Sequence, residues 1–139
     1  MRAPPFSLFS AISELVVTAA VLVVVGRNWN RKTFPLGLFL TVALFEALVN
    51  VMYMANRTAH AASGAEALAP GMRLAFALHG MLSLGAYLWF VVLGVIAWVN
   101  QQAGRFWFRE HRAHTLAFLI VWSISVISGE TIFVLRYLV

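Results

Sequence analysis

Apolar residues fill four long runs of the chain, and short stretches rich in Arg, Gly, Pro and other polar residues separate these runs. A helix needs about 20 consecutive apolar residues to cross the hydrocarbon core of a bilayer. The pattern therefore predicts four membrane-spanning helices, at roughly 6–26, 34–57, 71–101 and 108–138. Because most connections are short, we expect an all-α, antiparallel four-helix transmembrane bundle.

The ends of the first two predicted helices carry different signals. The first run leads into the basic stretch GRNWNRK, which is a stop-transfer pattern, so we expect this helix to be retained and not cleaved as a signal peptide. The second is followed by TAHAASGAEALAP, residues 58–70, which is small, polar and typical of a flexible loop.

Composition supports the membrane assignment. Of the 139 residues, 62% are hydrophobic and 11% are charged, whereas soluble domains are nearer half apolar and a quarter charged. The length indicates one polytopic domain over residues 1–139. The absence of Cys excludes disulfides, thiolate metal sites and cysteine nucleophiles. The net charge of +5 comes from Arg-rich connections, which favours contact with lipid headgroups over nucleic-acid binding.

The Lys and Arg residues also predict an orientation. One side of the predicted bundle carries Arg27, Arg31, Lys32, Arg105, Arg109 and Arg112. The other side carries Arg2, Arg57, Arg73 and Arg136. The positive-inside rule then places both termini on the non-cytoplasmic side of a bacterial inner membrane.

Each predicted helix contains one ionisable side chain at about the same depth. At a rise of 1.5 Å per residue, each of them lies roughly 12–16 Å below the outer boundary. These residues are Glu14, Glu46, His79 and Glu130. An antiparallel bundle would bring them into one layer, which is the strongest functional prediction from the sequence.

Polar neighbours extend this layer along the helices. Asn50 and Tyr53 follow Glu46 at spacings that keep them on one helix face, and Ser83 lies one turn after His79. Because lipid does not accept such stripes, we expect them to face the bundle interior.

The last predicted helix has a polar residue and two small residues near Glu130. Ser123 and Ile127 are spaced to share a face with Glu130. Ser128 and Gly129 are small enough to allow a close contact with another helix.

An ionised side chain inside a bilayer costs about 2.5–3.5 kcal/mol on insertion scales. Protonation of some glutamates, pairing of Glu with His⁺, or a bound cation would each lower this cost. Three interpretations follow: a hydrogen-bonded cluster that only fixes helix register, a metal site, and a site for protons or a polar ligand such as a quinone head group.

In the metal interpretation, the ligands are Glu14, Glu46, His79 and Glu130. Outside these ligands, the side chains that would hydrogen-bond to them and orient them are Asn50, Tyr53 and Ser83. The candidate ions are iron, manganese, zinc and copper, and oxygen-rich ligation favours iron or manganese. The Glu-x-x-His pairs of soluble di-iron bundles are absent.

The other histidines give weaker signals. His60 falls in the predicted loop. His111 and His114 lie one turn apart at the start of the last predicted helix and form a secondary candidate metal or haem-propionate site, although basic neighbours favour a solvated interfacial turn. No two histidines share a depth on facing helices, so bis-histidine haem is not expected, and a haem ligated by His79 alone is left open.

Sequence motifs of soluble enzymes are missing. The chain has no G-x-G-x-x-G, P-loop, H-E-x-x-H or G-x-S-x-G motif. No reaction is therefore assigned from motifs.

The segments LHGMLSLGAYLWFVVLG and REHRAHTLAFLIVWSISVISGETIFVLRYL resemble the four-helix bacterial membrane proteins linked to maturation of haem–copper cytochrome oxidases. The matching positions are His79, His111–Arg112, Trp122, Gly129 and Tyr137. The resemblance covers about half the chain, and the family's His at the start of the second helix is replaced here by RKTFP. It implies a respiratory, metal- or haem-related context, with respiratory complex subunits or a second copy of the chain as partners.

Overall fold

The computed structural model describes residues 5–62 and 70–137, and within these ranges the chain is helical with no strand. Its helices are α1 (Pro5–Trp29), α2 (Leu36–Ala62), α3 (Pro70–Gln102), α4 (Trp107–Glu110) and α5 (Arg112–Tyr137). Four of them, α1, α2, α3 and α5, are long and apolar enough to cross a membrane. The predicted all-α transmembrane bundle is confirmed, and the protein is a multi-pass membrane protein.

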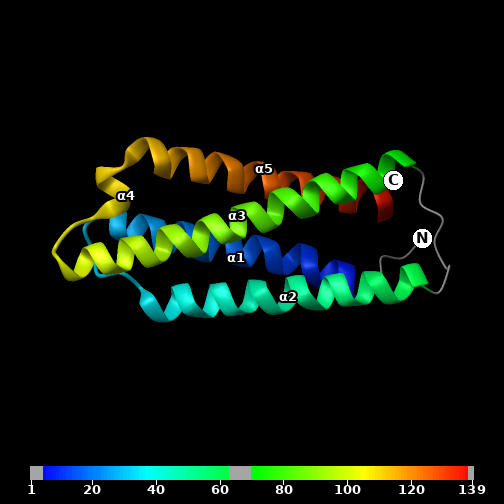
Figure 1. Ribbon diagram of the computed structural model, residues 1–139, viewed down its shortest axis with the longest axis horizontal. Coiled ribbons are helices and arrows are strands. Elements are labelled where there is room, and N and C mark those ends of the chain that lie inside the picture. Colours follow the sequence, from blue (N-terminus) through cyan, green and yellow to red (C-terminus); the bar gives the residue numbers. More distant parts are fainter. Residues whose placement is uncertain (1–4, 63–69, 138–139) are drawn as a thin grey trace.

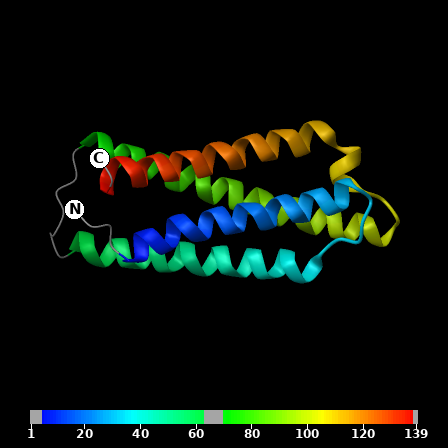
Figure 2. The same cartoon turned by 180° about the vertical axis from the view of Figure 1, so that it is seen from behind.

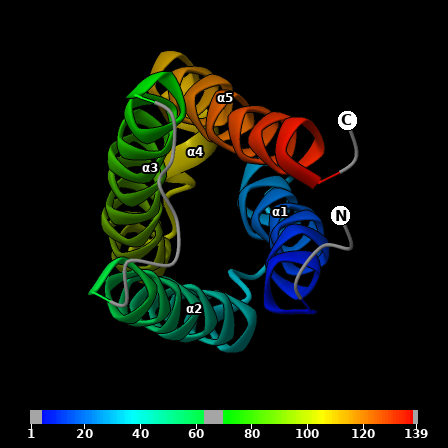
Figure 3. The same ribbon diagram turned by 90° about the vertical axis from the view of Figure 1, so that its right-hand side faces the viewer.

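The four long helices run antiparallel along one axis (Figures 1 and 2). At one end, here called the terminal end, α1 and α3 begin and α2 and α5 finish. At the opposite end, called the α4 end, α4 links α3 to α5. Viewed along the axis from the terminal end, the helices form a four-sided ring in the order α1, α2, α3, α5 (Figure 3).

Along the length of the bundle, buried apolar side chains occupy only one half. Among the described residues they begin at Val17 on α1 and at Ala86 on α3, and they end at Val42 on α2 and at Val126 on α5. All of these limits mark the half that adjoins α4. The terminal half contains no buried apolar side chain in the described part of the chain.

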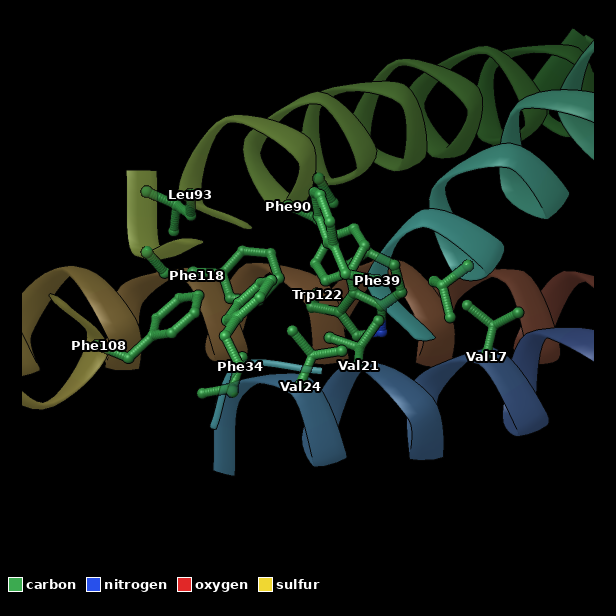
Figure 4. Close-up of a cluster of buried hydrophobic side chains, with 14 of the residues drawn as sticks. Val17, Val21, Val24, Phe34, Phe39, Phe90, Leu93, Phe108, Phe118 and Trp122 are labelled. Atoms are coloured by element: carbon green, nitrogen blue, oxygen red, sulfur yellow. The ribbon is translucent and has the colours of Figure 1, made fainter. Parts of the chain in front are cut away.

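An aromatic layer lies within the packed half (Figure 4). The ring of Phe90 stacks on Phe118 with centroids 6.2 Å apart, and it contacts Phe39 at 5.2 Å and Trp122 at 5.7 Å. Phe90 and Phe118 are fully buried. These rings come from α2, α3 and α5, so the layer holds three helices together inside the packed half.

Several hydroxyl groups on the long helices are satisfied within their own helix. Each one donates a hydrogen bond of 2.7–2.8 Å to the backbone carbonyl four residues earlier; the residues are Thr18, Thr41, Thr58, Ser123 and Thr131. This arrangement suits a helix surrounded by lipid, where no water is available as a partner.

The prediction of one continuous helix over 108–138 is wrong, because the chain breaks at His111 (φ −110°, ψ 60°) between α4 and α5. The fully buried ring of Phe108 and its backbone explain the break. The Phe108 N–H donates to Asn28 Oδ1 at 3.1 Å, and Thr115 Oγ1 donates to the Phe108 carbonyl at 2.8 Å. The first bond ties α4 to α1, and the second ties it to the first turn of α5.

The second helix is longer than expected, since α2 continues to Ala62. His60, predicted in a loop, is therefore part of the last turn of α2, and its side chain lies outside the described residues. Of the predicted loop 58–70, residues 63–69 also lie outside the described part of the chain.

Candidate functional site

A cavity of about 120 Å³ lies in the terminal half of the bundle, where buried apolar side chains are missing. Its lining includes all the ionisable residues predicted at one depth, Glu14, Glu46, His79 and Glu130. It also includes the predicted polar neighbours Asn50, Tyr53 and Ser83. The four long helices thus each contribute a titratable side chain to one cavity.

Glu14 is at the centre of this group. Its carboxyl group lies within electrostatic range of both Glu46 and Glu130. A methyl group placed on Gly129 would lie 3.1 Å from Glu14 Oε2, 3.1 Å from His79 Nε2 and 2.8 Å from His79 Cε1. α1 and α3 therefore bring Glu14 and His79 against the same point of α5, and the predicted close helix contact at Gly129 is confirmed.

A serine on α5 orients the His79 ring. His79 Nδ1 lies 2.9 Å from Ser128 Oγ, and Ser128 Oγ donates its own hydrogen to the Ser125 carbonyl at 2.7 Å. A hydroxyl has one hydrogen to donate, so Ser128 accepts from Nδ1–H. The neutral ring then keeps its lone pair on Nε2, the nitrogen that faces Gly129 and Glu14.

The remaining carboxyl groups differ in their partners. Asn50 Nδ2 donates to the Glu46 backbone carbonyl at 2.8 Å and approaches Glu46 Oε2 at 3.5 Å. In contrast, Glu130 Oε1 is buried and has no hydrogen-bond partner among the described residues. A buried acceptor without a donor is unfavourable, so Glu130 is where the cavity most needs a proton or a donor group.

A tryptophan links the cavity to the aromatic layer. Trp122 Nε1 donates to Thr18 Oγ1 at 3.1 Å, and Thr18 in turn donates to the Glu14 backbone carbonyl at 2.8 Å. Through Thr18, Trp122 on α5 therefore fixes the position of the turn of α1 that contains Glu14.

Residues near the ends of α1 and α5 form another part of the lining. Ser7 Oγ donates to Tyr137 OH at 3.3 Å. The Arg136 guanidinium lies over the rings of Phe76, at 5.3 Å, and Tyr137, at 5.2 Å. All of these residues line the cavity. In the sequence, Arg136 is recognisable only as a charge that sets topology, and nothing marks Phe76 as a cavity residue.

One predicted helix face is wrong. Ser123 is exposed, and so is Ile127, with 64% of its surface accessible, so neither shares the inward face of Glu130. The inward neighbours of Glu130 are the buried Val126 and the cavity-lining Gly129 and Phe133. Ser123 satisfies its hydroxyl on the Leu119 carbonyl instead.

Within residues 5–62 and 70–137, no three His, Cys, Asp or Glu side chains come close enough together to hold a metal ion. The predicted ligands Glu14, Glu46, His79 and Glu130 share a cavity without converging on one point. Metal binding here stays a prediction.

The secondary histidine pair is held by a tryptophan. His111 stacks on Trp107 with centroids 4.5 Å apart, and its Nδ1 lies 3.1 Å from the Trp107 carbonyl. The His111 and His114 rings are 6.3 Å apart and nearly perpendicular, at 77°. This packing accounts for the pair as part of the turn between α4 and α5.

No protein-family model, no curated protein and no solved structure matches the chain. The resemblance to the oxidase-maturation proteins therefore stays a prediction, and the geometry of the cavity carries the functional argument.

Proposed function

We propose that the protein takes up protons and a small polar ligand in the cavity of the terminal half, acting as a small transporter or as an accessory subunit of a membrane complex. The observation that carries this proposal is that a titratable side chain from every long helix lines one cavity. Ionisable residues inside membrane spans most often mark ion, proton or substrate pathways.

The dimensions of the cavity limit the ligand. A cavity of about 150 Å³ accommodates benzene, and this cavity measures about 120 Å³. It suits a molecule of about half a dozen non-hydrogen atoms, or the polar end of a larger one such as a quinone. The lining offers acceptors at Glu130 and His79 Nε2, and a donor at Ser83.

Proton handling is supported by the arrangement around Glu14. Carboxylates close together in a low-dielectric site do not all ionise, and they share protons instead. Glu14 lies within electrostatic range of Glu46 and Glu130. Glu14 Oε2 and His79 Nε2 also face each other across Gly129, since both lie 3.1 Å from the position of a Cβ on that residue. Glu14 and His79 thus approach one point of the cavity, and the Glu46 and Glu130 carboxyl groups line the same cavity as further proton acceptors.

Carbodiimide labelling tests the proposal. Dicyclohexylcarbodiimide reacts with protonated carboxyl groups in apolar surroundings, and mass spectrometry of peptides locates the adduct. We expect an adduct at one or more of Glu14, Glu46 and Glu130 at neutral pH. The exposed Glu110, which is paired with Arg105, is the internal control and should remain unmodified.

Proton movement is measured separately in proteoliposomes that contain a pH-sensitive dye, under an imposed potassium diffusion potential. The wild-type protein should acidify the lumen faster than Glu14→Gln. If no cavity glutamate is labelled and the two proteins give equal proton flux, the proposal is wrong.

A metal-binding role in the assembly of a haem–copper oxidase is the second candidate. The observation in its favour is the approach of Glu14 Oε2 and His79 Nε2 to one point beside Gly129. The resemblance of the C-terminal half supports the same context. Elemental analysis of purified wild-type protein and Glu130→Gln tests it, since a wild-type sample without stoichiometric iron, copper, manganese or zinc removes this candidate.

A further inference from the structure

A second cavity, of about 380 Å³, lies at the α4 end of the bundle. Its lining consists of Arg31, Gly104, Phe106, Arg109, Glu110 and Arg112. The apolar span of α1 ends at Trp29, and that of α5 begins at Arg112. This arginine cavity therefore lies where the helices leave the hydrocarbon core, at the level of the lipid headgroups.

The charges of the arginine cavity are unbalanced. Glu110 already pairs with Arg105, which does not line the cavity, through an Nη2–Oε2 contact of 2.8 Å. The hydrogen bond from Arg105 holds the pKa of Glu110 below its usual value, so this carboxylate stays ionised and matched. The guanidinium groups of Arg31, Arg109 and Arg112 leave the cavity strongly positive.

The arginines are held in place around Trp29. Arg109 Nη1 donates to the Trp29 carbonyl at 3.4 Å, and the Arg112 guanidinium lies 5.7 Å from the centroid of the Trp29 ring. Arg31 has a left-handed backbone (φ 57°), and its N–H donates to the Asn28 carbonyl at 3.1 Å. A left-handed conformation is unfavourable at a non-glycine residue and persists where the surroundings fix it.

We propose that the arginine cavity binds the phosphate of an anionic phospholipid. Guanidinium groups match phosphate oxygens in paired, charge-assisted hydrogen bonds. α5 also begins at this cavity, and the positive end of its dipole adds to the attraction for an anion.

The surface beside the cavity favours a lipid over free phosphate. Leu116 and Ile120 follow Arg112 at intervals of one helical turn, and they expose 55% and 58% of their surfaces. A phosphate held by Arg112 thus has an apolar strip directly below it, on which an acyl chain can lie. This inference is independent of the function proposed for the other cavity.

Native mass spectrometry of the detergent-solubilised full chain tests the proposal. The protein is titrated with phosphatidylglycerol, with phosphatidylcholine of the same acyl chains, and with inorganic phosphate. The test variant is Arg31→Gln/Arg112→Gln. The matched control is Arg27→Gln/Lys32→Gln, which removes the same charge from the same end of the bundle at exposed residues that do not line the cavity.

We expect the wild-type protein to bind phosphatidylglycerol roughly tenfold more tightly than phosphatidylcholine, which corresponds to one or two charge-assisted hydrogen bonds. The test variant should lose this preference, and the control should keep it within about twofold. Equal loss in both variants, no preference in the wild type, or binding of inorganic phosphate without the lipid would each overturn the proposal. If thermal unfolding shows that the double variant does not fold, Arg112→Gln alone decides by the same criteria.

Discussion

His79 on α3 donates a hydrogen bond from Nδ1 to the hydroxyl of Ser128 on α5, with the two atoms 2.9 Å apart. The Ser128 hydroxyl in turn donates a hydrogen bond to the Ser125 carbonyl. The second nitrogen of the ring is consequently fixed as an acceptor that faces the cavity. Since the bond joins two helices, it sets both the orientation of the ring and the tautomer.

Substitution Ser128→Ala should release this tautomer. Nδ1 then loses its acceptor, and both neutral forms become populated. Nitrogen NMR of protein labelled at histidine should show the Nδ1–H form in the wild type and a mixture in the variant. Ser123→Ala removes an exposed hydroxyl from the same helix and should leave the His79 signals unchanged. Identical His79 spectra in all three proteins would contradict the assigned bond.

Substitution Gly129→Ala should separate α5 from α3, because the added methyl group would lie 2.8 Å from His79 Cε1. Overpacking of this kind costs about 1–3 kcal/mol, measurable as a lower free energy of unfolding in mixed micelles. The control is Gly80→Ala, next to His79 on α3, where an added Cβ meets nothing within 4 Å. The control should be neutral or slightly stabilising, since alanine favours helix. A similar loss in both variants would argue against a tight contact at Gly129.

Substitution Asn28→Ala should destabilise the α4 end. Asn28 is fully buried, donates from Nδ2 to Gln101 Oε1 at 3.1 Å and accepts from the Phe108 N–H. The variant leaves that N–H buried without a partner, at a cost of about 1–3 kcal/mol. The exposed Asn30, whose side chain donates to the Gly26 carbonyl of its own helix, provides the control Asn30→Ala. Equal melting temperatures for the two variants would exclude a stabilising role for the buried amide.

The pairing of Glu110 with Arg105 should make stability depend on pH in acid. Because the hydrogen bond from Arg105 lowers the folded-state pKa of Glu110, its stabilisation is present above the unfolded-state pKa and disappears as the pH falls through the folded-state value. The melting temperatures of the wild type and Glu110→Gln should therefore converge between about pH 6 and about pH 3.

Salt supplies the control for this pH effect. At about 1 M salt the Debye length is only about 3 Å, so the difference at neutral pH should shrink. A difference that is insensitive to both salt and acid would mean that the ion pair does not contribute.

Depth in the membrane was predictable from the sequence. Glu14 was located by counting from the start of the first span, and Glu130 by counting back from the end of the last. Both counts succeed because the bilayer fixes the length of each span and every residue adds the same rise. The two side chains line the same cavity although they are far apart in the chain.

Rotation about the helix axis was harder to predict. Spacing alone grouped Ser123 and Ile127 with Glu130, yet both are exposed. A serine that bonds to its own helix backbone is tolerated in lipid, so its polarity does not identify the inward face. That face is selected by close contacts such as the one at Gly129, which depend on other helices.

The break at His111 could not be read from local sequence. It depends on the bond between Phe108 and Asn28, which are 80 residues apart. The same separation hides the structural role of Asn28, since within GRNWNRK it is one of several polar residues after a span.

The uneven distribution of buried side chains determines which part of the bundle opens first by local unfolding. Segments with few buried apolar contacts open at a lower free energy than the packed core. Amide hydrogens around Glu14 and His79 should thus exchange faster than those around Phe90 and Phe118, which are fully buried. A ligand can then enter and leave by local opening of the helix ends, while the aromatic layer around Phe90 stays packed. The rate of this opening can change while the global stability stays constant.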